Sequence, residues 1–223
     1  MTARALVTGF EPYAGRGRNP AGEIATRLDG SEVAGIRLVG RNLPVTVAAL
    51  DEIIPAMLAE VDPAAVIGLG LCPNEAVIRL ERVAINLADF EIPDNDGLVL
   101  IDQPIDAGES AARFATLPLR RIQEALLQAG IPARLSNSAG TYLCNKALYR
   151  FLGAIEQRGR AVPCGFLHLP YVPEQVAGMI AEMQAARSIE RHRRPDIPSM
   201  GLELMVEAVR IALAVTLAQN GLG

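Results

Sequence analysis

The sequence predicts an α/β protein with a largely parallel central sheet. Short apolar runs, typical of strands that are buried on both faces, alternate along the chain with longer segments of helical periodicity. Half of the 223 residues are hydrophobic and 21% are charged, which is enough apolar material for one sizeable core and excludes a disordered chain. No repeat or linker divides the sequence, so residues 1–223 are expected to form a single domain.

The amino-terminal region predicts a strand, a helix and a second strand. Residues 3–8 form an apolar run that is expected to be a buried strand. Asn19 and Pro20 predict the start of a helix over residues 20–28, because an asparagine side chain caps free N–H groups and proline suits the first helical position. Residues 36–43 predict the next strand.

The middle of the chain continues the alternation. Residues 45–61 predict a helix, which Pro55 is expected to kink. Residues 65–71 are entirely apolar and predict a parallel strand covered on both faces. Residues 78–87 predict another strand. Residues 93–107 carry D-N-D-G and Q-P turn signals and predict an irregular surface loop.

The carboxyl-terminal half repeats the pattern. Residues 118–129 predict a helix, 133–137 a strand, 142–157 a helix and 164–169 a strand. Two further helices are expected at residues 174–186 and 200–219.

The charge balance excludes several partners. Lysine and arginine number 21 against 25 acidic residues, so the formal charge is −4, and the one basic run, at residues 191–194, is too short to form a nucleic-acid-binding face. The longest stretches without a charged residue are 13 residues, shorter than the roughly 20 that a membrane span needs. Glu11 and Pro12 interrupt the first apolar run, so no signal peptide is predicted, and three cysteines are too few for a disulfide scaffold. A cytoplasmic protein is expected.

The search for a catalytic base is short, because the sequence contains two histidines. His192 lies among three arginines and is expected to be a surface residue. His168 lies at the carboxyl end of a predicted strand, where catalytic groups of α/β sheets gather. A histidine in apolar surroundings is also often a hydrogen-bonded core residue, so position alone leaves both roles open for His168.

Cys144 is the strongest candidate nucleophile among the three cysteines. It lies in the first turn of a predicted helix, where free N–H groups and the helix dipole lower the pKa of a thiol and can hold an oxyanion. Cys72 and Cys164 are expected to be buried structural thiols. The cysteines and histidines show no metal-ligand spacing, so neither a metal nor another cofactor is expected.

A cysteine nucleophile and a histidine base need a third group that orients the base. Glu81 is an unusual carboxylate within an apolar strand, where an unpaired charge is costly. It can orient a histidine, or it can simply form a salt bridge with Arg79 or Arg82. From the residues alone, the sequence predicts a cysteine hydrolase of unknown substrate with an unassigned third member.

Four segments of the sequence resemble the pyroglutamyl peptidase I family, cysteine peptidases that remove an N-terminal 5-oxoprolyl residue. They are L-V-T-G-F-E-P-Y at 6–13, L-E-R-V-A-I-N at 80–86 with I-P-D-N at 92–95, S-N-S-A-G-T-Y-L-C-N at 136–145, and G-F-L-H-L-P-Y-V-P-E-Q at 165–175. The resemblance implies a three-layer α/β/α sandwich with a mixed, largely parallel central sheet, assembled as a homotetramer. It also implies a catalytic triad of Cys144, His168 and Glu81 and a thioester intermediate.

The resemblance also implies a pocket for the flat, uncharged lactam ring of pyroglutamate. Phe10 and Tyr13 match the ring-stacking aromatic residues of the family, and Asn19 matches a polar pocket residue. Main-chain groups near three further residues are expected to bind the lactam amide: Gly70, Leu71 and Leu143.

Two differences from the family pattern concern charge. Asn74 and Glu75 stand where the family usually has Gly-Arg, and Glu91 stands where it usually has an arginine. Negative charge beside the site raises the pKa of a cysteine. Two alternatives stay open beside the peptidase, a related cysteine amidase for another small lactam and a catalytically weakened binding homologue, and the reversed charges are the reason for the second. If Glu75 and Glu91 are instead paired with nearby arginines, they have no effect on the site.

Overall fold

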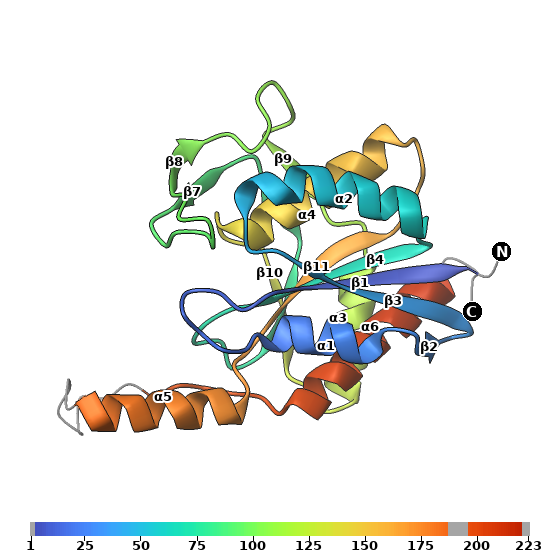
Figure 1. Cartoon of the computed structure of the whole chain (residues 1–223). Helices are drawn as coiled ribbons and strands as arrows, with labels where there is room; N and C mark the ends of the chain where they lie inside the picture. Colours follow the sequence, from blue (N-terminus) through green and yellow to red (C-terminus); the bar gives the residue numbers. More distant parts are fainter. Residues whose placement is uncertain (1–2, 187–195, 220–223) are drawn as a thin grey trace.

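A seven-stranded mixed sheet forms the centre of the protein in the computed structural model, which describes residues 3–186 and 196–219 (Figure 1). Its strand order is β10-β5-β11-β4-β1-β3-β2. The strands are β1 (Arg4–Phe10), β2 (Glu32–Val33), β3 (Ile36–Leu43), β4 (Ala65–Leu71), β5 (Ile78–Glu81), β10 (Ala133–Ser136) and β11 (Cys164–Leu169). Strands β3, β1, β4 and β11 run parallel, whereas β5 is antiparallel to β11 and parallel to β10.

Helices cover both faces of this sheet (Figure 1). One face packs against α1 (Pro20–Leu28), α3 (Leu119–Gln128) and α6 (Leu202–Gln219). The opposite face packs against α2 (Val47–Val61), which continues through Pro55, and α4 (Leu143–Gln157). Helix α5 (Pro173–Ala186) extends away from the sheet and buries only Val176. The predicted sandwich with a mixed, largely parallel sheet is confirmed.

Local signals located the main elements well. Asn19 caps α1, and its Oδ1 accepts a hydrogen bond from the Ala21 backbone N–H at 3.1 Å, with Pro20 at the start of the helix. Every residue of β4 is buried, as expected for an all-apolar strand between two helical layers. The alternation of side chains across β4 and β11 places Gly70, Phe166 and His168 on the sheet face covered by α2 and α4.

The single strand predicted at residues 78–87 is wrong, because the chain leaves the central sheet after Glu81. The Arg82 backbone N–H donates to the Ser136 carbonyl, and its own carbonyl accepts from the Ala115 N–H, so Arg82 connects two sheets. The next residues form β6 (Val83–Ile85), which pairs with β9 (Ala112–Phe114) in a separate two-stranded ribbon. An apolar period shows that a segment is extended, but it does not show which strand the segment pairs with.

The loop predicted at residues 93–107 is also only partly correct. It contains β8 (Leu100–Gln103), which pairs with β7 (Ala88–Phe90). Residues 98–101 are an apolar run, but it lies between the turn signals on either side, and all four residues of β8 are exposed or half-buried. The turn signals therefore hid a short strand on the surface.

Candidate active site

The Glu81 and His168 side chains meet on the sheet face below α4. In the antiparallel pairing of β5 with β11, His168 lies opposite Arg79 and Glu81 lies opposite Phe166, so Glu81 is the diagonal neighbour of His168. His168 Nδ1 lies 2.8 Å from Glu81 Oε1. Glu81 is completely buried and His168 is 5% exposed. A carboxylate on Nδ1 holds the proton there and leaves Nε2 available as a base.

Glu81 also contacts Arg79, so the two roles considered for it coexist. Arg79 Nε lies 3.1 Å from the same oxygen, Glu81 Oε1. The other basic neighbour, Arg82, instead lies within 3.4 Å of Asn137 Oδ1. Glu81 is therefore both a histidine partner and one half of a buried ion pair.

Cys144 is the second residue of α4, and its sulfur packs against Gly70. A Cβ atom at Gly70 would lie 2.7 Å from Cys144 Sγ and 2.8 Å from Phe166 Cε1. Gly70 also pairs with His168 in the register of β4 and β11. The thiol and the imidazole thus flank the same glycine, and both line one pocket. The sequence carried a signal for this close approach, because glycines within a buried strand mark sites where another group comes near the backbone.

The expected lowering of the Cys144 pKa by the helix N-terminus is wrong. Burial raises the pKa of the thiol, and Cys72 and Glu81 add to the rise, while the backbone hydrogen bond of Cys144 lowers it by less. Desolvation of a thiolate therefore outweighs the helix terminus. A thiol in this state needs a base to take its proton if it is to act as a nucleophile, and the His168 imidazole lines the same pocket.

Of the other two cysteines, Cys164 is buried as expected, whereas Cys72 is half-buried. Cys164 is 1% exposed, and burial raises its pKa. Burial also raises the pKa of Cys72, although Arg79, whose Nη1 lies 3.4 Å from Cys72 Sγ, opposes the rise. His192 lies outside the described residues.

A pocket of about 550 Å³ opens beside Cys144 and His168. This volume lies within the range of small-molecule sites. Five of the six residues expected to bind substrate line it: Phe10, Tyr13, Asn19, Leu71 and Leu143. The sixth, Gly70, lies behind the Cys144 sulfur.

Aromatic rings form much of the pocket wall, and the sequence did not identify all of them. Tyr142 packs edge-on against Phe90 at a centroid distance of 4.8 Å and lies 6.1 Å from the Tyr13 ring. Burial raises the pKa of Tyr13 and of Tyr142 to about 12, so both hydroxyls stay neutral and can donate hydrogen bonds. Tyr142 could have been inferred from its position two residues before the candidate nucleophile, whereas Phe90 comes from a short strand that carried no signal.

Asn19 lies at the pocket, as expected, and its side chain also has partners within the protein. It lines the pocket, but its Oδ1 caps α1 and its Nδ2 donates to the Glu11 carbonyl at 3.1 Å. Its side chain thus already has partners within the protein, and its main effect is to hold the amino-terminal loop against α1.

Glu75 and Glu91, the two glutamates that differ from the family pattern, have different surroundings in the structure. Glu75 does not line the pocket, because its Oε1 is bound by Arg134 at 2.9 Å and by Arg79 at 3.3 Å. Glu91 does line the pocket and is exposed, and its carboxylate has no ion-pair partner among the residues that the structure describes. Of these two glutamates, Glu91 is therefore the one that adds uncompensated negative charge beside the site.

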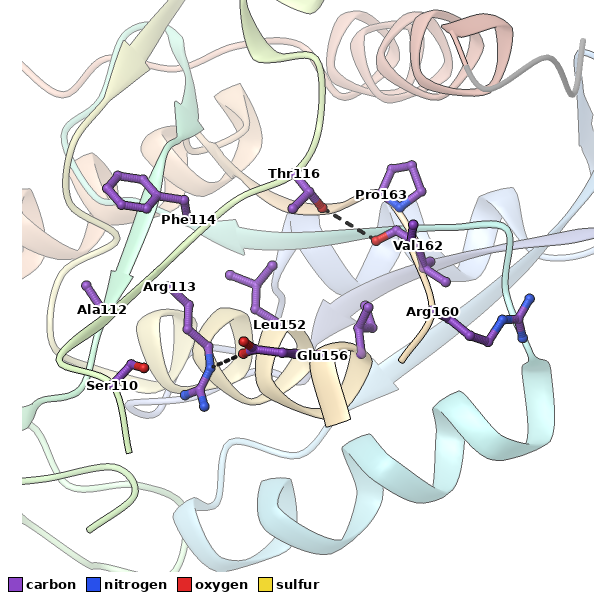
Figure 2. A pocket seen from close by; sticks show the side chains of 12 residues that line it. Ser110, Ala112, Arg113, Phe114, Thr116, Leu152, Glu156, Arg160, Val162 and Pro163 are labelled. Carbon is purple, nitrogen blue, oxygen red and sulfur yellow. Dashed lines mark hydrogen bonds and ion pairs between the residues drawn. The ribbon is translucent and has the colours of Figure 1, made fainter. Parts of the chain in front are cut away.

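A second pocket, of about 560 Å³, lies away from these residues, between β9 and the carboxyl end of α4 (Figure 2). Its central cation, Arg113, is already bound by Glu109 and Glu156 and lies over the Tyr149 ring. None of the predicted site residues lines it. Across residues 3–186 and 196–219, no group of three or more His, Cys, Asp or Glu side chains could hold a metal ion. None of the helices described is long and apolar enough to cross a membrane.

Comparison with known proteins agrees with this geometry. A family model described as pyroglutamyl peptidase matches residues 3–219. The pyrrolidone-carboxylate peptidase of Pyrococcus furiosus is 40% identical over 97% of this chain and 99% of its own length, and that of Klebsiella pneumoniae is 37% identical over 98% and 94%.

Solved structures give the same result. A mutant pyrrolidone carboxyl peptidase of Pyrococcus furiosus superposes with a TM-score of 0.90 at 39% identity, covering 97% of this chain and 99% of that one. The enzyme of Thermococcus litoralis gives a TM-score of 0.90 at 37% identity, covering 99% and 96%. The chain therefore belongs to the pyroglutamyl peptidase family of cysteine peptidases.

Proposed function

We propose that the protein is an exopeptidase that hydrolyses the amide bond after an N-terminal pyroglutamyl residue, with Cys144, His168 and Glu81 as its catalytic triad. The observation that carries the proposal is the buried Glu81–His168 contact of 2.8 Å beside a pocket that both His168 and Cys144 line. The names of the relatives, pyrrolidone-carboxylate peptidases, support this choice of substrate.

The acylation step follows from the arrangement of these groups. His168 Nε2 takes the proton from the Cys144 thiol while the sulfur attacks the carbonyl carbon of pyroglutamate. The negative charge that develops on the carbonyl oxygen lies beside the start of α4, where no side chain caps the helix and backbone N–H groups are available. The imidazolium then protonates the leaving amine, the C–N bond breaks, and a thioester is left on Cys144.

Hydrolysis of the thioester reverses these roles. His168 takes a proton from a water molecule, whose oxygen attacks the thioester carbon. The C–S bond breaks, the sulfur recovers the proton from His168, and pyroglutamate is released. Throughout both steps Glu81 stabilises the imidazolium and keeps its ring in one orientation.

The pocket accounts for selection of a flat, neutral ring. Phe10 and Tyr13 supply apolar faces for the ring, and the main chain at Leu71 and Leu143 lies close enough to the pocket to bind the lactam amide. Substrates that lack the lactam would leave these polar groups unpaired, which is how a hydrogen-bonding site rejects analogues. Gly70 also makes room for the Cys144 sulfur, and the binding of the lactam by main-chain groups near it stays part of the proposal.

The direct test is release of a chromogenic amine from its pyroglutamyl derivative, compared with the prolyl and glutamyl derivatives. Hydrolysis of the pyroglutamyl compound alone is expected, since proline lacks the lactam oxygen and glutamate carries a charge. Hydrolysis of another cyclic amide with no release from the pyroglutamyl derivative would contradict the proposal and favour a related amidase. Binding without turnover would favour a weakened homologue.

The family resemblance also leads us to propose a cytoplasmic homotetramer. Light scattering on the purified protein should then give a mass four times that of the 23.8 kDa chain. A monomer mass at micromolar concentration would contradict this assembly.

A further inference from the structure

Arg79 lies next to the proposed catalytic residues without being one of them. In the register of β5 and β11 it is directly opposite His168, so the two side chains extend from the same face of the sheet. Its Nε lies 3.1 Å from the Glu81 oxygen that contacts His168. Arg79 and His168 therefore share one carboxylate oxygen.

Hydrogen bonds hold the guanidinium of Arg79 in this position. Nη2 donates to Ser136 Oγ at 2.7 Å and to the Ser138 carbonyl at 2.6 Å, and Nη1 contacts Glu75 at 3.3 Å. The side chain is 18% exposed. Burial alone lowers the pKa of Arg79, but Glu81, Cys72 and Glu75 outweigh it and raise the pKa, so the group is a permanent cation.

Glu81 depends on few partners for its orientation. Its Oε1 contacts Arg79 and His168, whereas its Oε2 is buried and has no hydrogen-bond partner among the described residues. A buried carboxylate with one oxygen unpaired is costly. Arg79 is thus the permanent charge that keeps the ionised Glu81 in the orientation that His168 uses.

We infer that Arg79 is a positioning residue of the proposed triad, which holds Glu81 against His168 and opposes protonation of the site. The inference rests on the proposed function only in taking Cys144 and His168 as the reacting pair. The cation favours the ionised carboxylate and, from across the strand pair, disfavours a second positive charge on His168. The geometry therefore makes Arg79 a determinant of the pH range in which the enzyme works.

The sign of the effect can be worked out from the charges. Removing a cation makes every proton near it harder to remove, so both limbs of the pH profile of kcat/KM should move to higher pH. The titratable and charged groups around Cys144 and His168 come from several elements: Arg79 and Glu81 of β5, Cys72 and Glu75 after β4, Tyr13 after β1, Tyr142 before α4, Asp89 of β7 and Glu91 after it. Arg79 is the one permanent cation of this set, so its loss is not compensated by another member.

The experiment compares Arg79→Gln with Arg79→Lys, using Arg134→Gln as the matched control. Arg134 lies beside Arg79 in the register of β10 and β5 and binds the same Glu75, but it has no contact with Glu81. Arg79→Gln is expected to lower kcat/KM and to move both limbs upward by about one pH unit, a typical size for loss of a nearby charge. Arg79→Lys should keep the limbs near their original pH but lower kcat, because a lysine cannot reproduce the planar fork of hydrogen bonds. Arg134→Gln should leave the profile unchanged.

A second readout does not depend on the substrate. The rate at which iodoacetamide alkylates Cys144, followed by peptide mass spectrometry across the pH range, should show the same upward shift in Arg79→Gln. This measurement separates the inference from the proposed function, because it holds even if pyroglutamyl peptides are not cleaved. If Arg79→Gln does not fold, Arg79→Lys still separates the effect of the positive charge on the pH limbs from the effect of the hydrogen bonds on kcat.

Three results would overturn the inference. The first is a folded Arg79→Gln protein in which neither the pH limbs nor the alkylation profile shifts. The second is an equal shift in Arg134→Gln, which would place the effect on Glu75. The third is an Arg79→Lys profile that moves as far as that of Arg79→Gln.

Discussion

Replacing Gly70 with alanine should separate the position of the nucleophile from the stability of the fold. The new Cβ would lie 2.7 Å from Cys144 Sγ, about 1 Å closer than carbon and sulfur normally approach, and 2.8 Å from the Phe166 ring. The sulfur or the strand must move by about that amount. Overpacking of this kind costs about 1–3 kcal/mol of stability. A displacement of about 1 Å at a reacting atom can cost about 100-fold in rate, so kcat should fall more than the stability loss explains.

The matched control for this substitution is Gly68→Ala. A Cβ at Gly68, on the same strand, would lie 2.5 Å from Cδ2 of the same Phe166 ring, and its three nearest neighbours are all atoms of that ring instead of the Cys144 sulfur. Both variants should lower the midpoint of thermal unfolding, whereas only Gly70→Ala should lower kcat toward the pyroglutamyl substrate by about two orders of magnitude. Equal kcat values for the two folded variants would refute the reasoning.

Three further predictions follow from the site. Cys144→Ser and His168→Ala should each reduce kcat by orders of magnitude, and Cys144→Ser should do so with little change in the urea midpoint of unfolding; retained activity in either folded variant would remove that residue from the mechanism. Peptides with lysine directly after pyroglutamate should have a kcat/KM a few times that of peptides with glutamate, an effect that shrinks with salt and disappears in Glu91→Gln, because Glu91 is an exposed, unpaired carboxylate at the pocket. Equal values at low salt would contradict this. The free energy of unfolding should fall as the pH rises above about 9, since burial raises the pKa of Cys164 above its unfolded value of 9.0 and the unfolded chain then loses the proton first; Cys164→Ala should decline less steeply in urea titrations between pH 7 and 10.

The elements that the sequence predicted best are those with strong local signals. The cap at Asn19, the all-apolar β4 and the periodic α4 depend on residues close together in the chain, and the structure has all three where they were expected. The two-stranded ribbons formed by β6 to β9 were not predicted, and the sequence predicted β6 as a continuation of β5. These strands have three or four residues each, and what defines them is pairing with a strand elsewhere in the sequence.

The proposed catalytic residues could be ranked as candidates from the sequence, but the contacts between them in space could not be predicted. The residue types and positions of Cys144 and His168 favoured a nucleophile and a base, yet Glu81 could not be chosen over other carboxylates without the family resemblance. Its choice depends on the antiparallel register of β5 with β11, which brings it diagonally opposite His168. Register between strands 80 residues apart is a property of the whole sheet, so a local pattern does not reveal it.

The charge differences from the family show how the surroundings change the meaning of a residue. From the sequence, Glu75 was expected to raise the pKa of the cysteine. In the structure, two arginines on adjacent strands bind Glu75, and one of these, Arg79, also binds Glu81. The carboxylate thus helps to orient a cation that supports the proposed triad, instead of adding negative charge to it. Glu91 has no such partner among the described residues and faces the pocket, where a substrate would meet it. The two glutamates look equivalent in the sequence, but Glu75 helps to orient a residue beside the proposed triad, whereas Glu91 is placed to affect which substrates bind.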